Sequence, residues 1–412
     1  MRARLRTVIF GLVLLGLLWL GVGHGPAYAL SDEQNLVAEV WRIVNRAYLD
    51  ETFNHQNWWF LRQRVLKQSL NDRETTYAAI QGMLAALDDP YTRLLRPEQY
   101  RSLQTSTSGE LTGVGLQITK DEEDKFLRVI APIEGSPAER AGIQPKDQVL
   151  KIEGTATPNL TLDEAANRMR GPAGSKVTLT LQRPDENQPF DVTLVRDHIT
   201  LNPVSADLQT TSNGVKVGYL RLSQFNANAS AELASAIERM EAQGAEAYVL
   251  DLRNNPGGLL QAGIEIARLW LDEGTIVYTV SRQGILDSFE AHGPALTQDP
   301  LVVLVNEGTA SASEILAGAL QDNGRAQLVG TVTFGKGLIQ SLFDLSDGSG
   351  LAVTVAKYET PDHHDINRLG ITPDRIVEVK PLARDMFGTN RDPQYQAALD
   401  LLSASVVIAG VS

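Results

Sequence analysis

Between residues 215 and 380, apolar runs typical of strands alternate with amphipathic stretches typical of helices. Such alternation predicts a mostly parallel sheet, because each crossover helix must bury its apolar side on that sheet. The expected strands are 218–222, 247–252, 301–305 and 327–329, the helices between them are 231–243, 259–271 and 311–321, and a hairpin follows at 339–345 and 351–358. The expected fold class of this region is therefore α/β.

Two regions with different patterns precede the α/β region. Residues 31 to about 100 show helical periodicity, whereas residues 103–195 contain short strand-like runs broken by Gly, Pro and Asp, with one helix expected at 162–169. The 412 residues are enough for several domains with cores of their own. We expect a helical amino-terminal domain over 30–102, a β-rich module over 103–195, an α/β domain over 196–385, and a tail helix within 386–412.

Residues 1–29 have the pattern of a secretory signal peptide. Three arginines precede an apolar run from Val8 to Val22, and Ala27 and Ala29 place small residues at the −3 and −1 positions of a cleavage site. An uncleaved membrane anchor is the alternative, but the apolar run is shorter than the roughly 20 residues that span a bilayer. We therefore expect a cleaved signal and an exported protein.

Composition excludes several kinds of site. The chain has no cysteine, which excludes disulfides, thiolate zinc sites and cysteine nucleophiles. Of its six histidines, His363 and His364 are adjacent and would point to opposite faces of an extended chain, so a metal site is not expected. His198 and His292 lie in polar, turn-like segments, which disfavours a Ser-His-Asp triad. With 37 basic against 50 acidic residues, nucleic acid is not an expected partner.

Three segments rich in small residues follow expected strands of the α/β region, where ligand sites of parallel sheets lie. They are Asp251–Gly258, Val305–Glu314 and Gly330–Gly337. The last contains the pattern GxxxxGK, but Gly337 stands where a nucleotide-binding loop has Ser or Thr, and no helix is evident after it. We therefore do not expect a nucleotide site.

Ser311 and Lys336 could carry chemistry in these segments. A lysine acts as a base only when burial lowers its pKa from about 10.4, and Phe334, Leu338 and Ile339 supply apolar surroundings. Ser311 precedes an expected helix, whose free N–H groups could stabilise an oxyanion. However, Ser311-Ala-Ser-Glu314 is also a capping box, a structural device worth about 1 kcal/mol. The local pattern alone favours the cap.

Several separated motifs resemble those of the carboxyl-terminal processing (tail-specific) serine peptidases. They are Thr309-Ala-Ser-Ala-Ser-Glu-Ile315, Gln321-Asp322 and Thr333-Phe-Gly-Lys-Gly337. The resemblance implies a crotonase/ClpP-like catalytic domain that needs no cofactor. The roles that it implies are nucleophile for Ser311, general base for Lys336, orientation of the base for Gln340, an oxyanion hole made by the N–H groups of Gly257 and Ala312, and a supporting role for Asp322.

Residues 103–195 resemble a PDZ domain. Thr112-Gly-Val-Gly-Leu-Gln-Ile118 stands in place of the carboxylate-binding loop, and residues 135–147 match the helix-and-turn segment. The N–H groups of such a loop bind a terminal carboxylate while the peptide adds as a strand. The resemblance implies substrate contacts from Gly113, Val114, Gly115 and Leu116, and a coupling role for Arg170. Taken alone, Gly113 and Gly115 would be turn glycines.

The family resemblance predicts a serine endopeptidase that removes a carboxyl-terminal extension through an acyl-enzyme. Residues 41–50 and 52–58 are similar to the branch of oxygenic phototrophs, which implies the photosystem II D-one precursor as the protein partner, proximity to a membrane, and the thylakoid lumen or periplasm as the location. A general periplasmic tail-specific peptidase and a non-catalytic PDZ adaptor are the alternatives, and a monomer is favoured. Residues 362–365 depart from the family pattern, which usually has a glycine-containing turn before the segment matching 370–374.

Overall fold

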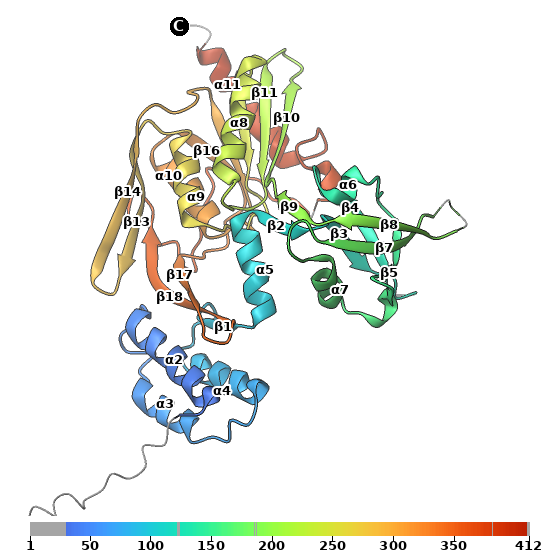
Figure 1. Ribbon diagram of the computed structural model, residues 1–412. Helices are drawn as coiled ribbons and strands as arrows, with labels where there is room; N and C mark the ends of the chain where they lie inside the picture. The colour runs from blue at the N-terminus through green and yellow to red at the C-terminus, as the bar shows by residue number, and fades with distance from the viewer. Residues whose placement is uncertain (1–29, 122–123, 185, 187, 381, 410–412) are drawn as a thin grey trace, which may run out of the picture.

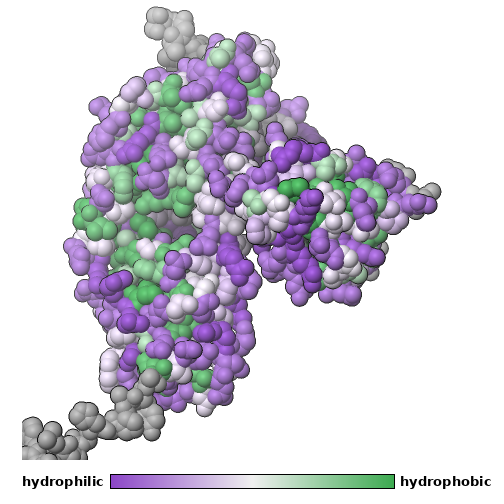
Figure 2. Space-filling view, in the orientation of Figure 1, coloured by the Kyte–Doolittle hydropathy of each residue, from purple (hydrophilic) through white to green (hydrophobic). Residues whose placement is uncertain are grey.

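The computed structural model describes residues 30–409 apart from 122–123, 185, 187 and 381. The expected signal peptide lies outside these residues. In the described part of the chain, no helix is long and apolar enough to cross a membrane. Three regions follow one another along the chain (Figure 1), and a lobe formed by the middle region projects from the side of the molecule (Figures 1 and 2).

The first region consists of three helices, α2 (Asp32–Ala47), α3 (Trp58–Leu66) and α4 (Arg73–Ala85). Ser31 and Gln34 form a capping box that starts α2, and the apolar face of α2 is buried. The core of this region also includes Leu345, Leu351 and Val353 of a β-hairpin much later in the chain, over residues 338–359. The Tyr77 hydroxyl donates a hydrogen bond of 2.7 Å to Asp347, 270 residues away. The helices therefore share a core with the hairpin that they cover.

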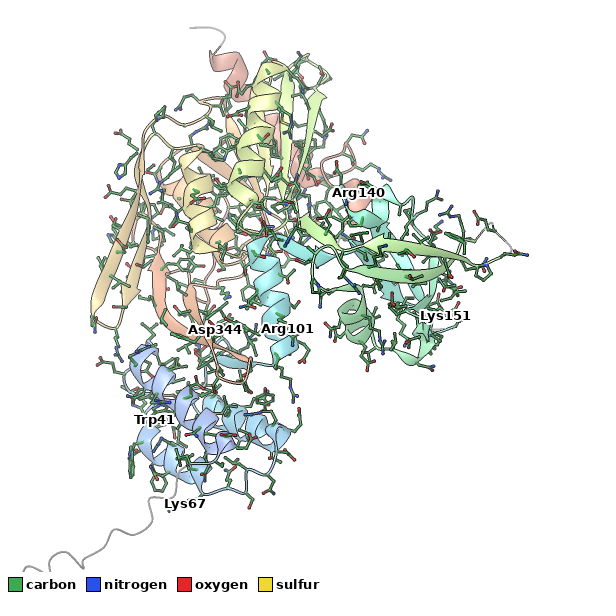
Figure 3. All side chains as sticks on the ribbon, in the orientation of Figure 1. Trp41, Lys67, Arg101, Arg140, Lys151 and Asp344 are labelled. Carbon is green, nitrogen blue, oxygen red and sulfur yellow. The ribbon has the colours of Figure 1, made fainter. Side chains whose placement is uncertain are left out.

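A short strand and a helix connect the first region to the projecting lobe. Strand β1 (Arg93–Leu95) pairs antiparallel with β18 (Gly350–Glu359), and α5 (Pro97–Ser108) follows it. The Tyr100 hydroxyl donates to Asp344 at 2.9 Å, and Figure 3 labels Asp344 and, on α5, Arg101. β2 (Glu110–Gly113) and β9 (Asp197–Thr200) then form a separate two-stranded ladder, which carries the chain into and out of the lobe.

The projecting lobe has the order of strands β3-β4-β5-β7-β8, with β6 paired to β5. Its buried apolar residues all lie between Val114 and Leu194. The predicted helix at 162–169 is confirmed as α7, where Thr161 and Glu164 form a capping box. The elements are β3 (Leu116–Lys120), β4 (Leu127–Pro132), α6 (Pro137–Arg140), β5 (Gln148–Ile152), β6 (Thr155–Ala156), η1 (Thr157–Asn159), α7 (Leu162–Met169), β7 (Lys176–Gln182) and β8 (Phe190–Val195).

The third region contains the expected mostly parallel sheet, in the order β10-β11-β12-β15-β16-β19, with only β10 antiparallel to its neighbour. Helices α8, α9 and α10 bury one face of this sheet and α11 buries the other. The elements are β10 (Val204–Thr210), β11 (Lys216–Leu222), α8 (Ala229–Ala242), β12 (Ala247–Asp251), α9 (Leu260–Arg268), β15 (Leu301–Val305), α10 (Ala312–Asp322), β16 (Ala326–Gly330), β19 (Arg375–Ile376), η2 (Arg384–Met386) and α11 (Pro393–Ala409).

A second sheet of this region holds the predicted hairpin as β17 (Leu338–Asp344) and β18. It also contains a hairpin that was not expected from the sequence, β13 (Glu273–Ser281) and β14 (Gly284–His292). The order of this sheet is β1-β18-β13-β14, and β17 also pairs with β18. Through β1, the first region contributes a strand to this sheet. The fold class is therefore a helical amino-terminal region, a β-rich lobe and an α/β domain.

Candidate active site

Ser311 lies between β15 and α10 in an unusual backbone conformation. Its φ and ψ are 58° and −118°, a region that costs a residue with a side chain about 1–3 kcal/mol. Its N–H donates to the Glu314 carboxylate at 2.8 Å, and the Glu314 N–H donates to the Ser311 carbonyl. Because Ser311 precedes the first turn of α10, its side chain lies beside N–H groups that have no partner within the helix. This is where an oxyanion would be stabilised.

One cavity of about 370 Å³ is lined by five of the residues predicted for the site. Ser311 and Ala312 come from the start of α10, Gly257 comes from the loop after β12, and Lys336 and Gln340 come from the loop before β17 and from β17 itself. The Gln340 amide donates to the Thr354 hydroxyl at 3.4 Å. The fold thus brings three separate segments of the sequence to one hollow.

The Lys336 side chain is partly buried in this cavity. Burial lowers the pKa of its ammonium group, the positive charge of Arg93 lowers it further, and Glu314 opposes the shift. The Lys336 ammonium lies 5.1 Å from the centre of the Tyr91 ring, and it forms no ion pair with any described residue. The lysine is therefore biased toward the neutral amine, which can accept a proton.

Glu314 ties the segment of Ser311 to the segment of Lys336. Its side chain is fully buried and accepts hydrogen bonds from the N–H groups of Ser311, Gly335 and Lys336, at 2.8, 2.7 and 2.9 Å. It also accepts from the Thr333 hydroxyl at 2.6 Å. The sequence pattern indicates Glu314 only as a capping residue. In the structure, it fixes the two segments to each other.

Tyr358 is a further residue of the cavity that the sequence pattern does not indicate. Its side chain is buried, and its hydroxyl donates a hydrogen bond to the Lys336 carbonyl. Burial and the negative charge of Glu314 raise the pKa of this hydroxyl, whereas a hydrogen bond with the Ser311 side chain acts in the opposite direction. The hydroxyl thus remains protonated between the two predicted catalytic residues.

The backbone around Ser311 offers two N–H groups without a partner among the described residues, those of Ala312 and Gly258. The Gly257 N–H, in contrast, donates to the Asn255 side chain at 2.9 Å. Asn255 is buried, and its own amide donates to the Leu222 carbonyl at 2.8 Å. A side chain on Gly257 would come within 2.6 Å of the Ala310 carbonyl, so only glycine fits there.

The predicted carboxylate-binding residues gather at a second, smaller cavity in the lobe. Gly113, Val114, Gly115, Leu116 and Arg170 all line it, and its volume is about 70 Å³. Val114 and Gly115 lie between β2 and β3, and their N–H groups have no partner in the described part of the chain. Arg170 also lines a neighbouring cleft of about 660 Å³ along α5. Free N–H groups beside an apolar hollow are suited to a terminal carboxylate.

Three other sequence features lie outside the cavity of Ser311. Asp322 ends α10, and its carboxylate accepts a hydrogen bond of 3.1 Å from the Asp362 N–H. His363 stacks on Tyr278 and lies 3.1 Å from Glu359. Strand β17, not a helix, follows the GxxxxGK segment, so that segment lacks the helix of a phosphate-binding loop.

Comparisons with known proteins agree with this architecture. Residues 216–377 match the model of peptidase family S41, and residues 128–183 match a PDZ domain. The chain is 60% identical to a carboxyl-terminal-processing protease of Picosynechococcus sp. over 100% of its own length and 99% of that protein. It is 48% identical to carboxyl-terminal-processing peptidase 2, chloroplastic, of Arabidopsis thaliana, over 89% of this chain and 74% of that protein. The solved photosystem II D1 C-terminal processing protease is similar with a TM-score of 0.57 and 42% identity, over 89% of this chain and 100% of that one.

Proposed function

Because the chain belongs to peptidase family S41 and is a carboxyl-terminal-processing peptidase with a PDZ domain, we propose that Ser311 and Lys336 form its catalytic dyad. The observation that carries this proposal is the shared cavity, in which a serine at a helix start and a partly buried lysine of lowered pKa meet. A lysine in the neutral form can accept the proton of a serine hydroxyl.

In the proposed mechanism, the neutral Lys336 amine takes the Ser311 proton as the serine oxygen attacks the scissile carbonyl. The Ala312 N–H donates a hydrogen bond to the oxyanion. The Gly257 N–H becomes a second donor to the oxyanion when its hydrogen bond to the Asn255 side chain is shared or broken. Protonated Lys336 then gives its proton to the leaving amine, and an acyl-enzyme forms on Ser311. Water, deprotonated by Lys336, hydrolyses the acyl-enzyme. Gln340 orients Lys336, while Asp322 supports the fold at the other end of α10.

The PDZ groove is proposed to capture the free carboxyl terminus of the substrate. The N–H groups of Val114 and Gly115 receive the carboxylate, and the peptide pairs with the edge of β3. Arg170 lies between this groove and the cleft along α5. Helix α5 also supplies Leu103 and Thr107 to the cavity of Ser311, so we propose that Arg170 links the occupied groove to that cavity through α5.

The proposed substrate is a protein with a carboxyl-terminal extension, specifically the photosystem II D-one precursor. Support comes from the similarity to the solved D1 processing protease and to chloroplastic relatives. We accordingly propose an exported enzyme of the thylakoid lumen or periplasm, without a cofactor. Domain limits at 30–102, 103–195, 196–385 and 386–412 are part of the same proposal.

Substitution of the dyad tests the mechanism. Ser311→Ala and Lys336→Ala should abolish cleavage of a peptide with a free carboxyl terminus, while circular dichroism shows an unchanged fold. Lys67→Ala, at an exposed lysine that ends α3, is the matched control and should cleave normally (Figure 3). Turnover that persists in pure Lys336→Ala protein would exclude the dyad.

Mass spectrometry of paired peptides tests recognition. A peptide with a free carboxyl terminus should be cut faster than its amidated twin, because the amide cannot supply the carboxylate that the groove binds. Binding of the free-carboxyl peptide without any cleavage would contradict the proposed dyad and favour the adaptor alternative. A synthetic D-one tail compared with unrelated apolar tails then separates the specific enzyme from a general tail-specific peptidase.

A further inference from the structure

We propose that Arg93 is a positioning residue for the catalytic reaction, whose cationic side chain keeps Lys336 ready to accept the Ser311 proton, and that the Tyr91 ring holds the lysine in place. Both residues belong to the amino-terminal region, far along the sequence from the dyad. The inference rests on the Ser-Lys dyad proposed above, and it assigns part of the active site to a segment outside the α/β domain.

The backbone fixes the position of both residues. In strand β1, Arg93 pairs with Ala352 of β18. The same strand β18 carries Tyr358 and pairs with β17, which carries Gln340. Tyr91 is held by its N–H, which donates to the Asp89 carboxylate at 2.9 Å. The amino-terminal segment is therefore part of the sheet that builds one wall of the catalytic cavity.

Arg93 lies at the boundary between two hollows. It lines the catalytic cavity and also a neighbouring cleft of about 810 Å³. Its side chain is exposed, and it has no ion pair or hydrogen bond with the described residues. An arginine that stabilises a fold normally donates hydrogen bonds to carbonyl or carboxylate oxygens. The charge of Arg93 instead remains unneutralised beside the dyad.

The charged and titratable groups that face Lys336 shift its pKa in different directions. Arg93 on β1 favours the neutral amine, and burial does the same. Glu314 on α10 favours the charged form, as does the Tyr91 ring through its cation–π contact. Tyr358 on β18 is neutral because its own pKa is raised. Of these groups, only Arg93 is a cation.

A charge series at position 93 tests the proposal. Arg93→Lys, Arg93→Gln and Arg93→Glu are compared by the pH dependence of kcat/KM, measured with a quenched fluorescent peptide that has a free carboxyl terminus. Loss of the cation raises the Lys336 pKa, so the acid limb of the profile moves to higher pH. We expect the kcat/KM of Arg93→Lys to match that of the wild type. The kcat/KM of Arg93→Gln should fall roughly three- to tenfold at pH 7 and recover at alkaline pH, and that of Arg93→Glu should fall further at pH 7.

Two further variants sharpen the test. Arg239→Gln, at an exposed arginine of α8, changes the net charge equally and should leave the profile unchanged. Tyr91→Leu removes a contact that favours the charged lysine, so its acid limb should move to lower pH, opposite to Arg93→Gln. High salt should shrink the effect of Arg93→Gln, because the side chain is exposed.

Each outcome has a distinct meaning. Equal losses at all pH values in Arg93→Gln and Arg93→Glu, or no change in either, would overturn the positioning role of Arg93. Cleavage that persists in Lys336→Ala would instead overturn the dyad itself. Thermal melts of the position-93 variants should match the wild type, since the side chain has no partner in the folded protein.

Discussion

The buried Glu314 carboxylate accepts hydrogen bonds from the N–H groups of both members of the proposed dyad, Ser311 and Lys336. Replacement by Gln keeps the size of the side chain but turns an amide group toward N–H donors. We expect Glu314→Gln to lose about 2–4 kcal/mol of unfolding free energy and to lower kcat at least tenfold. Urea unfolding and steady-state kinetics measure the two effects.

Glu238→Gln is the control for this substitution, because Glu238 is exposed on α8. It should change neither quantity. An unaltered kcat in Glu314→Gln would show that the four hydrogen bonds to Glu314 do not position the dyad.

At the scale of residues, the sequence indicates those members of the site that lie in contiguous motifs. Ser311 and Lys336 are of this kind, whereas Gln340 is indicated only by the family resemblance, through its spacing of four residues from Lys336. The sequence does not predict that Tyr91 and Arg93 belong to the site, because Asp89-Pro-Tyr-Thr-Arg93 has the pattern of a turn. In addition, β18, the strand with which β1 pairs, is distant in the chain. The bond from Gly257 to Asn255 also cannot be predicted, since it depends on the path of one loop.

At the scale of elements, the loop between β2 and β3 contains two glycines with different requirements. Gly115 has a φ of +75°, and a Cβ there would lie 2.2 Å from the Ser136 Cβ. The nearest atom to a Cβ on Gly113 is 3.5 Å away, and Gly113 has no positive φ. Gly115→Ala should therefore raise KM for peptides with a free carboxyl terminus by roughly tenfold or more, and Gly113→Ala by less than about threefold.

The KM of each variant is measured from cleavage rates over a range of concentrations of a peptide with a free carboxyl terminus. Equal effects would mean that the loop tolerates a side chain at position 115, and that its backbone conformation does not form the carboxylate site. Because the substitutions are identical, any difference between them reports on the backbone at each position.

A buried network joins the loop after β12 to the start of α11. Arg253 donates to Asp251 at 2.6 Å and to Asp392 at 2.7 Å, and all three side chains are buried. Although burial acts to raise the pKa of Asp392, its hydrogen bonds and charge interaction with Arg253 hold that pKa below its usual value of 3.8. The interaction of Asp392 with Arg253 therefore adds its full contribution to the unfolding free energy at pH values above about 3.8. This contribution disappears as the pH falls through the lowered pKa of Asp392 in the folded protein.

Asp392→Asn should therefore destabilise the protein by about 3–5 kcal/mol at pH 7, because Arg253 loses an ionised partner. The difference from the wild type should shrink as pH falls below about 4. Urea midpoints between pH 3 and pH 7 measure it, with Asp385→Asn at an exposed carboxylate as the control. A difference that is constant with pH would contradict the proposed charge interaction.

The elements that the sequence predicts best are those with a strong period and clear ends. The helix at 162–169 and the strand at 301–305 agree residue for residue with α7 and β15. The hairpin of β13 and β14 is missed because most of β14 is exposed, so neither face gives an alternating apolar pattern. Helix α5 lies only partly within the helical region expected over 30–102, and its end falls in the region expected to be β-rich, since Tyr100 is its only buried residue.

At the scale of the whole molecule, the lobe and the amino-terminal helices differ in how they are stabilised. The lobe has a core of its own, and the residues at its ends, Gly113 and Asp197, are paired across β2 and β9. Replacing residues 114–196 by an Asn-Gly turn should leave a folded body that no longer prefers free carboxyl termini. Deleting residues 30–91 should expose Leu345, Leu351 and Val353, and cause aggregation.

Circular dichroism, gel filtration and the paired-peptide assay distinguish these two deletions. Aggregation of the protein without the lobe, together with a monodisperse protein without the helices, would contradict the expectation. Sequence periodicity indicates the helical region but not its dependence on the hairpin, because the shared core joins segments that lie far apart in the chain.

This shared core has a consequence for the order of events during synthesis. Helices α2, α3 and α4 leave the ribosome before the rest of the described fold, yet the β-hairpin that completes their core is translated about 270 residues later. At about 5–20 residues per second, the interval is roughly 15–50 s. During that time the apolar faces of the helices lack the hairpin residues against which they finally pack. A chaperone that binds apolar segments of nascent chains would therefore bind longest to this region. Of the described fold, the amino-terminal helices are thus made before the other two regions and are among the last elements to reach their final packing.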